Sequence, residues 1–257
     1  MCFNGGNHLK KLKLVRMLSG IAILVILLVM QVFLGKAGHY FANLVSYKQI
    51  DPYDIFARIS MHHIIQMIIA LIIIAVLSKV LKTDFYLKLG DVRKGTKYVA
   101  IFTAVLAFIS IILHIFLYAN NQLPSYNFPL GIRNVLGTLG FQLLLSGPSE
   151  EIVFRALPIT MLIYAFGKSV KISGHITLEV ILASILFALA HTKWSLMPFD
   201  FEVDYSQLVY SFVLGTIQGI VYQRSQSIIY PMLMHSISNV LMVGTGYLFN
   251  TLIVYYK

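Results

Sequence analysis

The sequence predicts an all-α membrane protein, a polytopic bundle of about seven transmembrane helices. Of its 257 residues, 58% are hydrophobic and only 12% are charged, whereas a soluble domain carries about 25% charged residues. The apolar residues also lie in blocks long enough to cross a bilayer, which takes about 20 residues of helix. The stretches between these blocks are too short for a separate soluble domain.

Seven apolar blocks divide the chain. They are residues 14–34, 59–81, 98–118, 131–166, 176–199, 207–222 and 228–249. The first block follows a basic stretch and resembles a secretory signal. It is longer than the apolar region of a signal peptide and no cleavage site follows it, so we expect a retained first span. The single cysteine, Cys2, excludes an internal disulfide and a zinc site built from cysteines.

Lys and Arg residues are distributed unequally between the two ends of the predicted bundle. With the N-terminus in the cytoplasm, thirteen of them lie in inside segments and six in outside segments, and Arg155 lies within a span. Cytoplasmic loops carry the excess of Lys and Arg in membrane proteins, so we expect a cytoplasmic N-terminus. The net charge of +10 is then a property of the membrane-facing loops and does not indicate a nucleic-acid partner.

The fourth block, residues 131–166, is too long for one straight span. A helix of this length would extend about 54 Å, whereas the hydrocarbon core of a bilayer is about 30 Å thick. Gly147 and Pro148 lie inside the block, and proline interrupts the hydrogen-bond ladder of a helix. We therefore expect a bent or broken helix near Gly147-Pro148, with a new helical start capped by Ser149.

Two carboxylates and a guanidinium follow this point in the fourth block. Ionisable residues within spans are energetically costly and are candidates for functional sites. Glu151 and Arg155 are four residues apart, so they share a helix face and can pair. Glu150 points about 100° away from that face, and a carboxylate free in a low-dielectric pocket suits a general base acting on water. The alternative is a buried ion-pair cluster with a structural role only.

Two further motifs contain histidine. Phe187 and His191 share a helix face, although a single buried histidine is more often a hydrogen-bonded core residue. His235 and Asn239 also share a face and offer an imidazole and an amide, or else a polar contact between helices. These residues and Glu150 lie on three separate blocks, away from the block ends. We therefore expect the bundle to bring them to one polar pocket.

In this order, E-E-x-x-x-R, F-x-x-x-H and H-x-x-x-N resemble the CPBP family, also called the Abi or CAAX-protease-type intramembrane proteases. By this resemblance the catalytic residues are Glu150, His191, His235 and Asn239, and the supporting residues are Glu151 and Arg155. The first glutamate and the first histidine would activate a water molecule, while the second histidine and the asparagine would stabilise the oxyanion. The resemblance divides the chain into helices without motifs (1–130), a catalytic core (131–249) and a short tail (250–257).

Two chemical schemes remain open for this constellation. The slightly preferred scheme uses no metal. In the second scheme, Glu150, His191 and His235 bind Zn²⁺ and leave an open position for water. The family is usually called a metalloprotease family, but this sequence lacks the H-E-x-x-H motif that fixes two zinc ligands on one helix.

The resemblance implies an endopeptidase of the bacterial plasma membrane that acts on a hydrophobic or membrane-associated peptide or small protein. Peptide maturation and bacteriocin immunity are the expected roles. The rival interpretation is a non-enzymatic transporter or a scaffold that binds a partner. Transporters often contain two related halves, and the sequence shows no such repeat. His62 and His63 are interpreted as interfacial and Glu179 as solvated, and neither they nor His114 are assigned a catalytic role.

Overall fold

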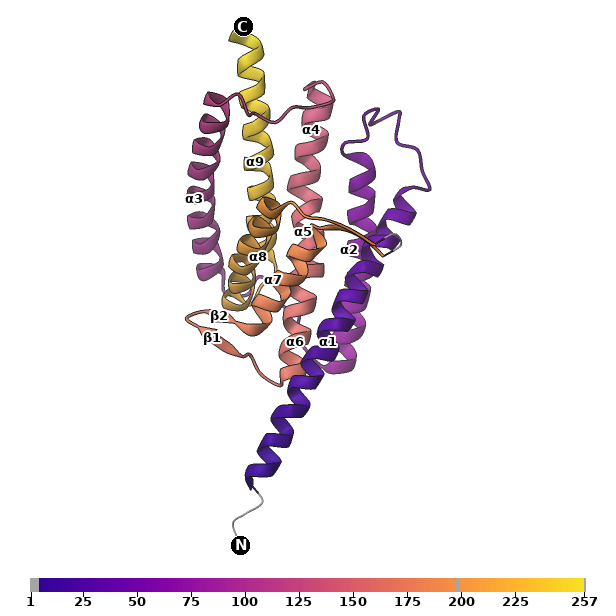
Figure 1. Ribbon diagram of the computed structural model, residues 1–257, viewed down its shortest axis with the longest axis vertical. Helices are drawn as coiled ribbons and strands as arrows, with labels where there is room; N and C mark the ends of the chain where they lie inside the picture. Colours follow the sequence, from indigo (N-terminus) through magenta and orange to yellow (C-terminus); the bar gives the residue numbers. More distant parts are fainter. Residues whose placement is uncertain (1–4, 197–198, 257) are drawn as a thin grey trace.

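Within residues 5–196 and 199–256, which the computed structural model describes, the chain forms seven helical passes that alternate in direction (Figure 1). They are α1 (Gly5–Ala42), α2 (Ala57–Leu81), α3 (Val92–Ala119), a composite helix from Ile132 to Phe166, α7 (Leu178–Ala190), α8 (Tyr205–Ser225) and α9 (Ile229–Tyr256). The two ends of the chain lie at opposite ends of the bundle. Cys2 lies outside the described residues.

Four helices are long and apolar enough to cross a membrane. They contain the segments Lys13–Ala42, Ala57–Leu81, Val92–Ala119 and Ile229–Leu252. Large apolar side chains stand exposed along the first three, such as Val29 on α1 at 63% and Phe108 on α3 at 68%. Apolar surfaces of this extent are typical of contact with lipid. The all-helical fold class is confirmed, with these four helices as candidate spans.

The fourth block was expected to be bent or broken near Gly147-Pro148, and of these two alternatives the break with a helical start at Ser149 is wrong. The chain remains helical throughout, as α4 (Ile132–Phe141), η1 (Gln142–Ser146), α5 (Gly147–Glu151), η2 (Ile152–Ala156) and α6 (Leu157–Phe166), where η1 and η2 are π-helical. Gly147 has helical dihedral angles (φ −55°, ψ −55°). Ser149 does not cap a helix, because its hydroxyl donates to the carbonyl oxygen of Ser146 at 3.2 Å.

Each π-helical turn ends two residues before a proline, Pro148 or Pro158. A proline ring crowds the carbonyl group four residues earlier and offers it no N–H donor. Widening the preceding turn moves that carbonyl group aside, so the helix continues where a regular α-helix would kink or stop. Single π-helical turns are frequent at functional sites, and α5 lies between two of them.

The fifth block is shorter as a helix than the sequence suggested. It was expected to extend over residues 176–199, but α7 ends at Ala190. A hairpin of β1 (Lys171–Ser173) and β2 (Ile176–Thr177) precedes α7, and a hairpin of β3 (Lys193–Leu196) and β4 (Phe199–Glu202) follows it. The hairpin after α7 is rich in apolar residues, which explains why hydrophobicity alone extended the block beyond the helix.

Glu179, interpreted from the sequence as solvated, is instead fully buried at the start of α7. Its carboxylate accepts hydrogen bonds from the backbone N–H of Val170 at 3.2 Å, from Gln223 Nε2 at 2.7 Å and from the Ser169 hydroxyl. A buried carboxylate needs such partners to offset its desolvation. Glu179 therefore joins the segment after α6 and the end of α8 to the start of α7.

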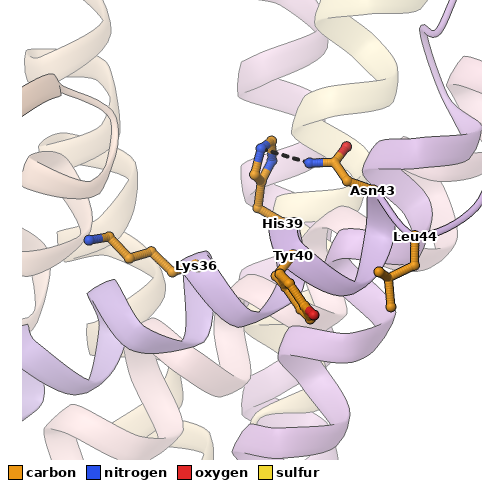
Figure 2. Close-up of a pocket in the computed structure, with 6 residues that line it drawn as sticks. Lys36, His39, Tyr40, Asn43 and Leu44 are labelled. Carbon is orange, nitrogen blue, oxygen red and sulfur yellow. Dashed lines mark hydrogen bonds between the residues drawn. The ribbon is translucent and has the colours of Figure 1, made fainter.

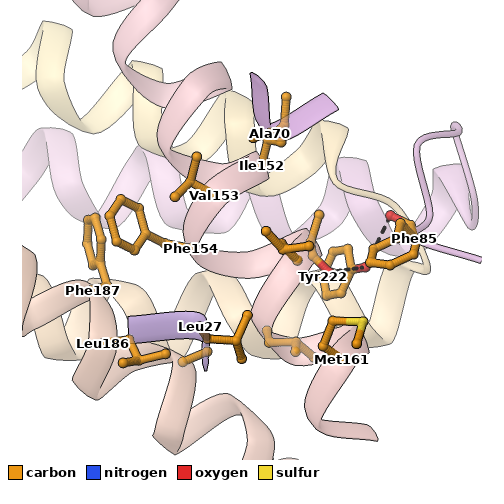
Figure 3. Close-up of a cluster of buried hydrophobic side chains, with 14 of the residues drawn as sticks. Leu27, Ala70, Phe85, Ile152, Val153, Phe154, Met161, Leu186, Phe187 and Tyr222 are labelled. Atoms are coloured by element: carbon orange, nitrogen blue, oxygen red, sulfur yellow. Dashed lines mark hydrogen bonds between the residues drawn. The ribbon is translucent and has the colours of Figure 1, made fainter. Parts of the chain in front are cut away.

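The main apolar core lies where α1, α2, η2, α6 and α7 meet (Figure 3). Leu27, Ala70, Val153 and Phe187 are among its members, and each is at most 3% exposed. Tyr222 of α8 closes one end of the core, where its hydroxyl donates to the carbonyl oxygen of Phe85 at 3.1 Å. The core thus fixes the composite helix against α1, α2 and α7, while α9 packs against α5.

The loop before α2 is anchored by Asp51, which is 1% exposed. Its carboxylate accepts hydrogen bonds from the backbone N–H groups of Ile55 at 3.1 Å, Phe56 at 2.8 Å and Ala57 at 2.8 Å. Burial alone would raise the pKa of Asp51, but these backbone donors outweigh it and hold the pKa below its usual value. Asp51 therefore stabilises the start of α2 in its ionised form.

Candidate active site

A cavity of about 680 Å³ lies inside the bundle, and all four catalytic residues expected from the sequence line it. Glu150 comes from α5, His191 from the residue that ends α7, and His235 and Asn239 from α9. The three segments are far apart in the sequence. The structure therefore brings together the carboxylate, both imidazoles and the amide that the motifs singled out.

Glu150 occupies the middle of this arrangement. Its Oε1 accepts a hydrogen bond from Ser146 Oγ at 3.3 Å. Its Oε2 lies 3.8 Å from His235 Nε2, which is too far for a hydrogen bond. The Glu150 side chain is 16% exposed, so the carboxylate faces the cavity while most of its surface is covered.

Glu151 points away from the cavity into the protein and is fully buried. Its Oε1 accepts a hydrogen bond from His235 Nδ1 at 2.7 Å, and its Oε2 lies 3.2 Å from Arg155 Nε. The Glu151–Arg155 pair expected from the four-residue spacing is present. The contact between Glu151 and His235 was not predicted from the sequence. Through this hydrogen bond, Glu151 also fixes the orientation of the His235 ring, which lines the cavity.

Arg155 is held on three sides. Besides its pair with Glu151, its Nη2 donates to Gln218 Oε1 of α8 at 2.5 Å. Its guanidinium carbon lies 3.8 Å from the centre of the Phe187 ring on α7. Arg155 therefore links η2 to α7 and α8, and it supports the face of the site that lies behind the cavity.

Hydrogen bonds fix which nitrogen of each imidazole carries its proton. His191 Nδ1 lies 2.9 Å from the carbonyl oxygen of Phe187, and His235 Nδ1 lies 2.7 Å from the Glu151 carboxylate. A carbonyl oxygen and a carboxylate only accept hydrogen bonds, so Nδ1 is the donor in both rings. The Nε2 atom of each neutral ring is then an acceptor, available to a proton donor such as water.

Asn239 reaches Glu150 through a serine. Its Nδ2 donates to Ser146 Oγ at 3.0 Å, and Ser146 in turn donates to Glu150. The amide therefore helps to orient the carboxylate. An amide nitrogen carries two hydrogens, so the second N–H of Asn239 is free for another acceptor.

Gly147 allows α5 to approach α9 closely. A Cβ atom at this position would lie 2.5 Å from Ser236 Oγ and 2.8 Å from the carbonyl oxygen of Met232. Real Cβ atoms essentially never come this close to backbone atoms. The absence of a side chain here brings the backbone of α9, and with it His235, next to the two glutamates of α5.

Sequence reasoning assigned no role to His63, which also lines the cavity from α2. Its side chain is 9% exposed, and its Nδ1 lies 2.5 Å from Ser149 Oγ. The interfacial interpretation rested on its place near the start of an apolar block. The stronger signal was the cost of any histidine within a span, which was the argument applied to His191 and His235.

The π-helical turns were also missed, and α1 supports one of them. Gln31 Nε2 donates to the carbonyl oxygen of Val153 in η2 at 3.4 Å. A widened turn leaves carbonyl groups without their usual helical partners, and a buried carbonyl group needs another donor. The N-terminal helices therefore contribute polar contacts to the site as well as apolar packing.

The residues of the cavity do not fit the zinc alternative as they are arranged. Within the described part of the chain, no three or more His, Cys, Asp or Glu side chains are grouped so that they could hold a metal ion. Glu150, His191 and His235 line the same cavity without forming such a group.

A second hollow, of about 410 Å³, lies on the surface of α1 near its end (Figure 2). It is lined by the last turns of α1, including Lys36 and His39, and by Asn43 and Leu44 just after the helix. His39 Nε2 lies 2.8 Å from Asn43 Nδ2, so these two side chains satisfy each other. None of the residues predicted as catalytic lies there.

Residues 132–241 match a protein-family model described as Rce1-like, type II CAAX prenyl endopeptidase. The matched segment begins with α4 and ends within α9, so it contains Glu150, His191, His235 and Asn239. This match confirms the resemblance to the CAAX-protease family that the three motifs carry. No curated protein and no solved structure matches the chain.

Proposed function

On the premise that residues 132–241 form a domain of the Rce1-like CAAX protease family, we propose that the protein is an intramembrane endopeptidase. It hydrolyses a peptide bond in a hydrophobic or membrane-associated peptide or small protein. One observation carries the proposal: the Glu150 carboxylate faces the cavity 3.8 Å from His235 Nε2, with His191 and Asn239 lining the same space. A general base and proton carriers therefore surround one site for water.

In the proposed reaction, a water molecule attacks the carbonyl carbon of the scissile bond, and Glu150 takes one proton from it. The Nε2 atom of His191 acts on this same proton, as a second acceptor beside Glu150. When the tetrahedral intermediate collapses, the C–N bond breaks and Glu150 returns the proton to the leaving amine. The products are a new carboxyl group and a new amine, so atoms and charges balance without a further reactant.

His235 and Asn239 stabilise the oxyanion of this intermediate. The Glu151 carboxylate accepts from His235 Nδ1 and holds the ring so that Nε2 faces the cavity. In the proposed reaction, Nε2 with a proton bound donates to the oxyanion. A buried carboxylate supports a catalytic histidine in the same way in serine proteases. The second N–H of Asn239 is the other donor. Donors aimed at developing charge are typically among the largest contributions to catalysis of this kind.

The cavity lining supports an apolar substrate. Besides the polar residues, it includes the side chains of Ile59, Phe141, Leu214, Met242 and Val243. These come from several different helices, so an extended peptide entering between helices would meet apolar contacts on more than one side. Peptide maturation and bacteriocin immunity are both compatible with such a substrate, and the proposal includes either role.

The proposal also covers the membrane topology. The seven helical passes are taken as seven spans with the N-terminus in the cytoplasm of a bacterial plasma membrane, as the distribution of Lys and Arg favours. The exception in length is α7, whose 13 residues extend about 20 Å and are shorter than the hydrocarbon core. Such a short helix is tolerated at membrane depth where it borders a protein cavity, and His191 at its end lines one.

The test compares the small peptides released by cells that express the wild-type protein or Glu150→Gln, which keeps the shape of the side chain and removes its basicity. We expect at least one peptide that depends on the wild-type protein and disappears with Glu150→Gln at equal protein abundance. Asp84→Asn is the control, because Asp84 is an exposed acid outside the cavity. Identical peptide sets for wild type and Glu150→Gln would refute the protease and favour the transporter or scaffold.

A further inference from the structure

We propose that His63 is a positioning residue of the reaction centre, which orients the attacking water beside Oε1 of Glu150. This inference rests on the proposed function. His63 lies on α2 (Ala57–Leu81), outside the segment that matches the family model. If His63 orients the attacking water, the N-terminal helices, which contain none of the three motifs, contribute a residue to the reaction centre.

The first observation is the placement of the two imidazoles around one carboxylate. His63 Nε2 lies 3.9 Å from Glu150 Oε1, and His235 Nε2 lies 3.8 Å from Glu150 Oε2. Glu150 thus stands between two rings that approach different oxygens. The His63 ring is also fixed by the Phe141 ring, whose centre lies 5.0 Å away in an edge-to-face arrangement.

The second observation is the hydrogen bond that orients the ring. Ser149 has one hydroxyl proton, which it donates to the carbonyl oxygen of Ser146 at 3.2 Å. With this donation, the Ser149 oxygen accepts from His63 Nδ1 in their 2.5 Å contact. The tautomer with the proton on Nδ1 is therefore part of the proposal. The Nε2 atom of the neutral ring is then an acceptor that faces the cavity and Glu150.

His63 Nε2 and Glu150 Oε1 lie 3.9 Å apart and both accept hydrogen bonds, so they do not bond to each other. A molecule that donates two hydrogens can bind to both of them. Water placed there donates one hydrogen to Glu150 and the other to His63. Both lone pairs of its oxygen are then directed away from these groups, and one of them faces a substrate carbonyl carbon in the cavity. His63 does not need to remove a proton, because Glu150 does so, and its effect is on the orientation of the water.

All three cavity histidines share this arrangement. His63, His191 and His235 each have Nδ1 held by an oxygen acceptor and each line the cavity. A histidine with a purely structural role would be satisfied by one neighbour and would not need to border the cavity. The repeated orientation supports a functional role for the ring of His63.

The experiment measures kcat and KM of the purified protein in lipid nanodiscs, with a peptide whose cleavage by cells depends on Glu150. For His63→Ala we expect kcat to fall about 100-fold, the scale of misplacing a reacting group by about 1 Å, while KM changes less than threefold. Added imidazole should restore part of kcat. Ser149→Ala, which releases the ring from its acceptor, should lower kcat less and in the same direction.

The control is His62→Gln, because this neighbouring histidine is absent from the cavity lining and should keep kcat unchanged. A His63→Ala variant that melts like the wild type and keeps kcat within twofold would overturn this inference alone. So would a loss of activity that follows a lowered melting temperature and is not restored by imidazole. Failure of the wild-type protein to cleave any such peptide would overturn the proposed function, and this inference with it.

Discussion

Arg155→Met removes a guanidinium that three neighbours depend on. Arg155 is 1% exposed, and it lies 3.2 Å from Glu151 Oε2 and 3.8 Å from the centre of the Phe187 ring. Removing one partner of a buried ion pair costs about 3–5 kcal/mol, because the remaining charge stays buried. Loss of the contact with the aromatic ring adds about 0.5–2 kcal/mol, whereas methionine fills most of the volume.

We therefore expect Arg155→Met to lower the free energy of unfolding by about 4–6 kcal/mol, against a net stability of about 5–15 kcal/mol for a typical protein. The melting temperature should fall by about 10 °C or more, and the variant should be less abundant in membranes. The assay is thermal unfolding of the purified protein in detergent micelles, with membrane abundance measured in parallel. Arg224→Met is the control, because Arg224 is exposed and exposed positions usually change stability by less than about 0.5 kcal/mol.

A double variant separates the charge from the packing. Arg155→Met with Glu151→Gln removes both charges, so it should recover about half of the lost stability. It should not recover activity, because His235 then loses the carboxylate that accepts from its Nδ1. The reasoning is refuted if Arg155→Met melts within 2 °C or so of the wild type, or if the double variant melts no higher than the single one.

Three further predictions test other parts of the structure. Gly147→Ala should lower activity at least tenfold by displacing α9. Gly244→Ala is the control and should not lower it, because a Cβ at Gly244 would meet only Leu139 Cδ2 at 3.8 Å. Equal activities of the two variants would contradict the close approach of α5 and α9. Asp51→Ala should destabilise the protein by about 0.5–2 kcal/mol near pH 7. Because the folded state lowers the pKa of Asp51, this difference should persist above the usual aspartate pKa of about 3.9 and disappear as the pH falls through the folded pKa; a difference independent of pH in thermal unfolding would contradict it. A strong chelator should leave peptide cleavage by the purified protein unchanged, and complete loss that zinc restores would rule out the metal-independent scheme.

Much of the helical framework could be predicted from the sequence, because long apolar runs have few alternatives to helices in a membrane. Six of the seven blocks each fall on one helical pass, although α1 (Gly5–Ala42) extends well beyond the expected block 14–34 at both ends. The exception was residues 176–199, where apolar residues continue into the hairpin that contains Phe199. Hydrophobicity predicts burial or contact with lipid, and it does not distinguish a helix from a short apolar hairpin.

The residues that line the cavity were predicted better than the hydrogen bonds between them. Glu150, His191, His235 and Asn239 could be selected because each is a costly polar residue within an apolar block. The hydrogen bond from His235 to Glu151 depends on how α5 and α9 pack, and a single sequence does not show which helices are neighbours. The same reason explains why His63, which is 86 residues away from Ser149, was not connected with the site.

The irregular parts of the composite helix could not be predicted either. Pro148 correctly indicated a disturbance, but a proline is compatible with a break, a kink or a widened turn. The choice depends on partners from other helices, such as Gln31 for the carbonyl group of Val153. Glu179 was misjudged for a similar reason, since its three hydrogen-bond donors lie on other segments.

The most direct measurement supplies the purified protein with a peptide identified in cells, in water enriched in ¹⁸O, and analyses the products by mass spectrometry. The wild-type protein should release a fragment with ¹⁸O in its new carboxyl group, and Glu150→Gln should release none although it melts at the same temperature. Equal cleavage by Glu150→Gln would contradict the assignment of Glu150 as the group that activates water.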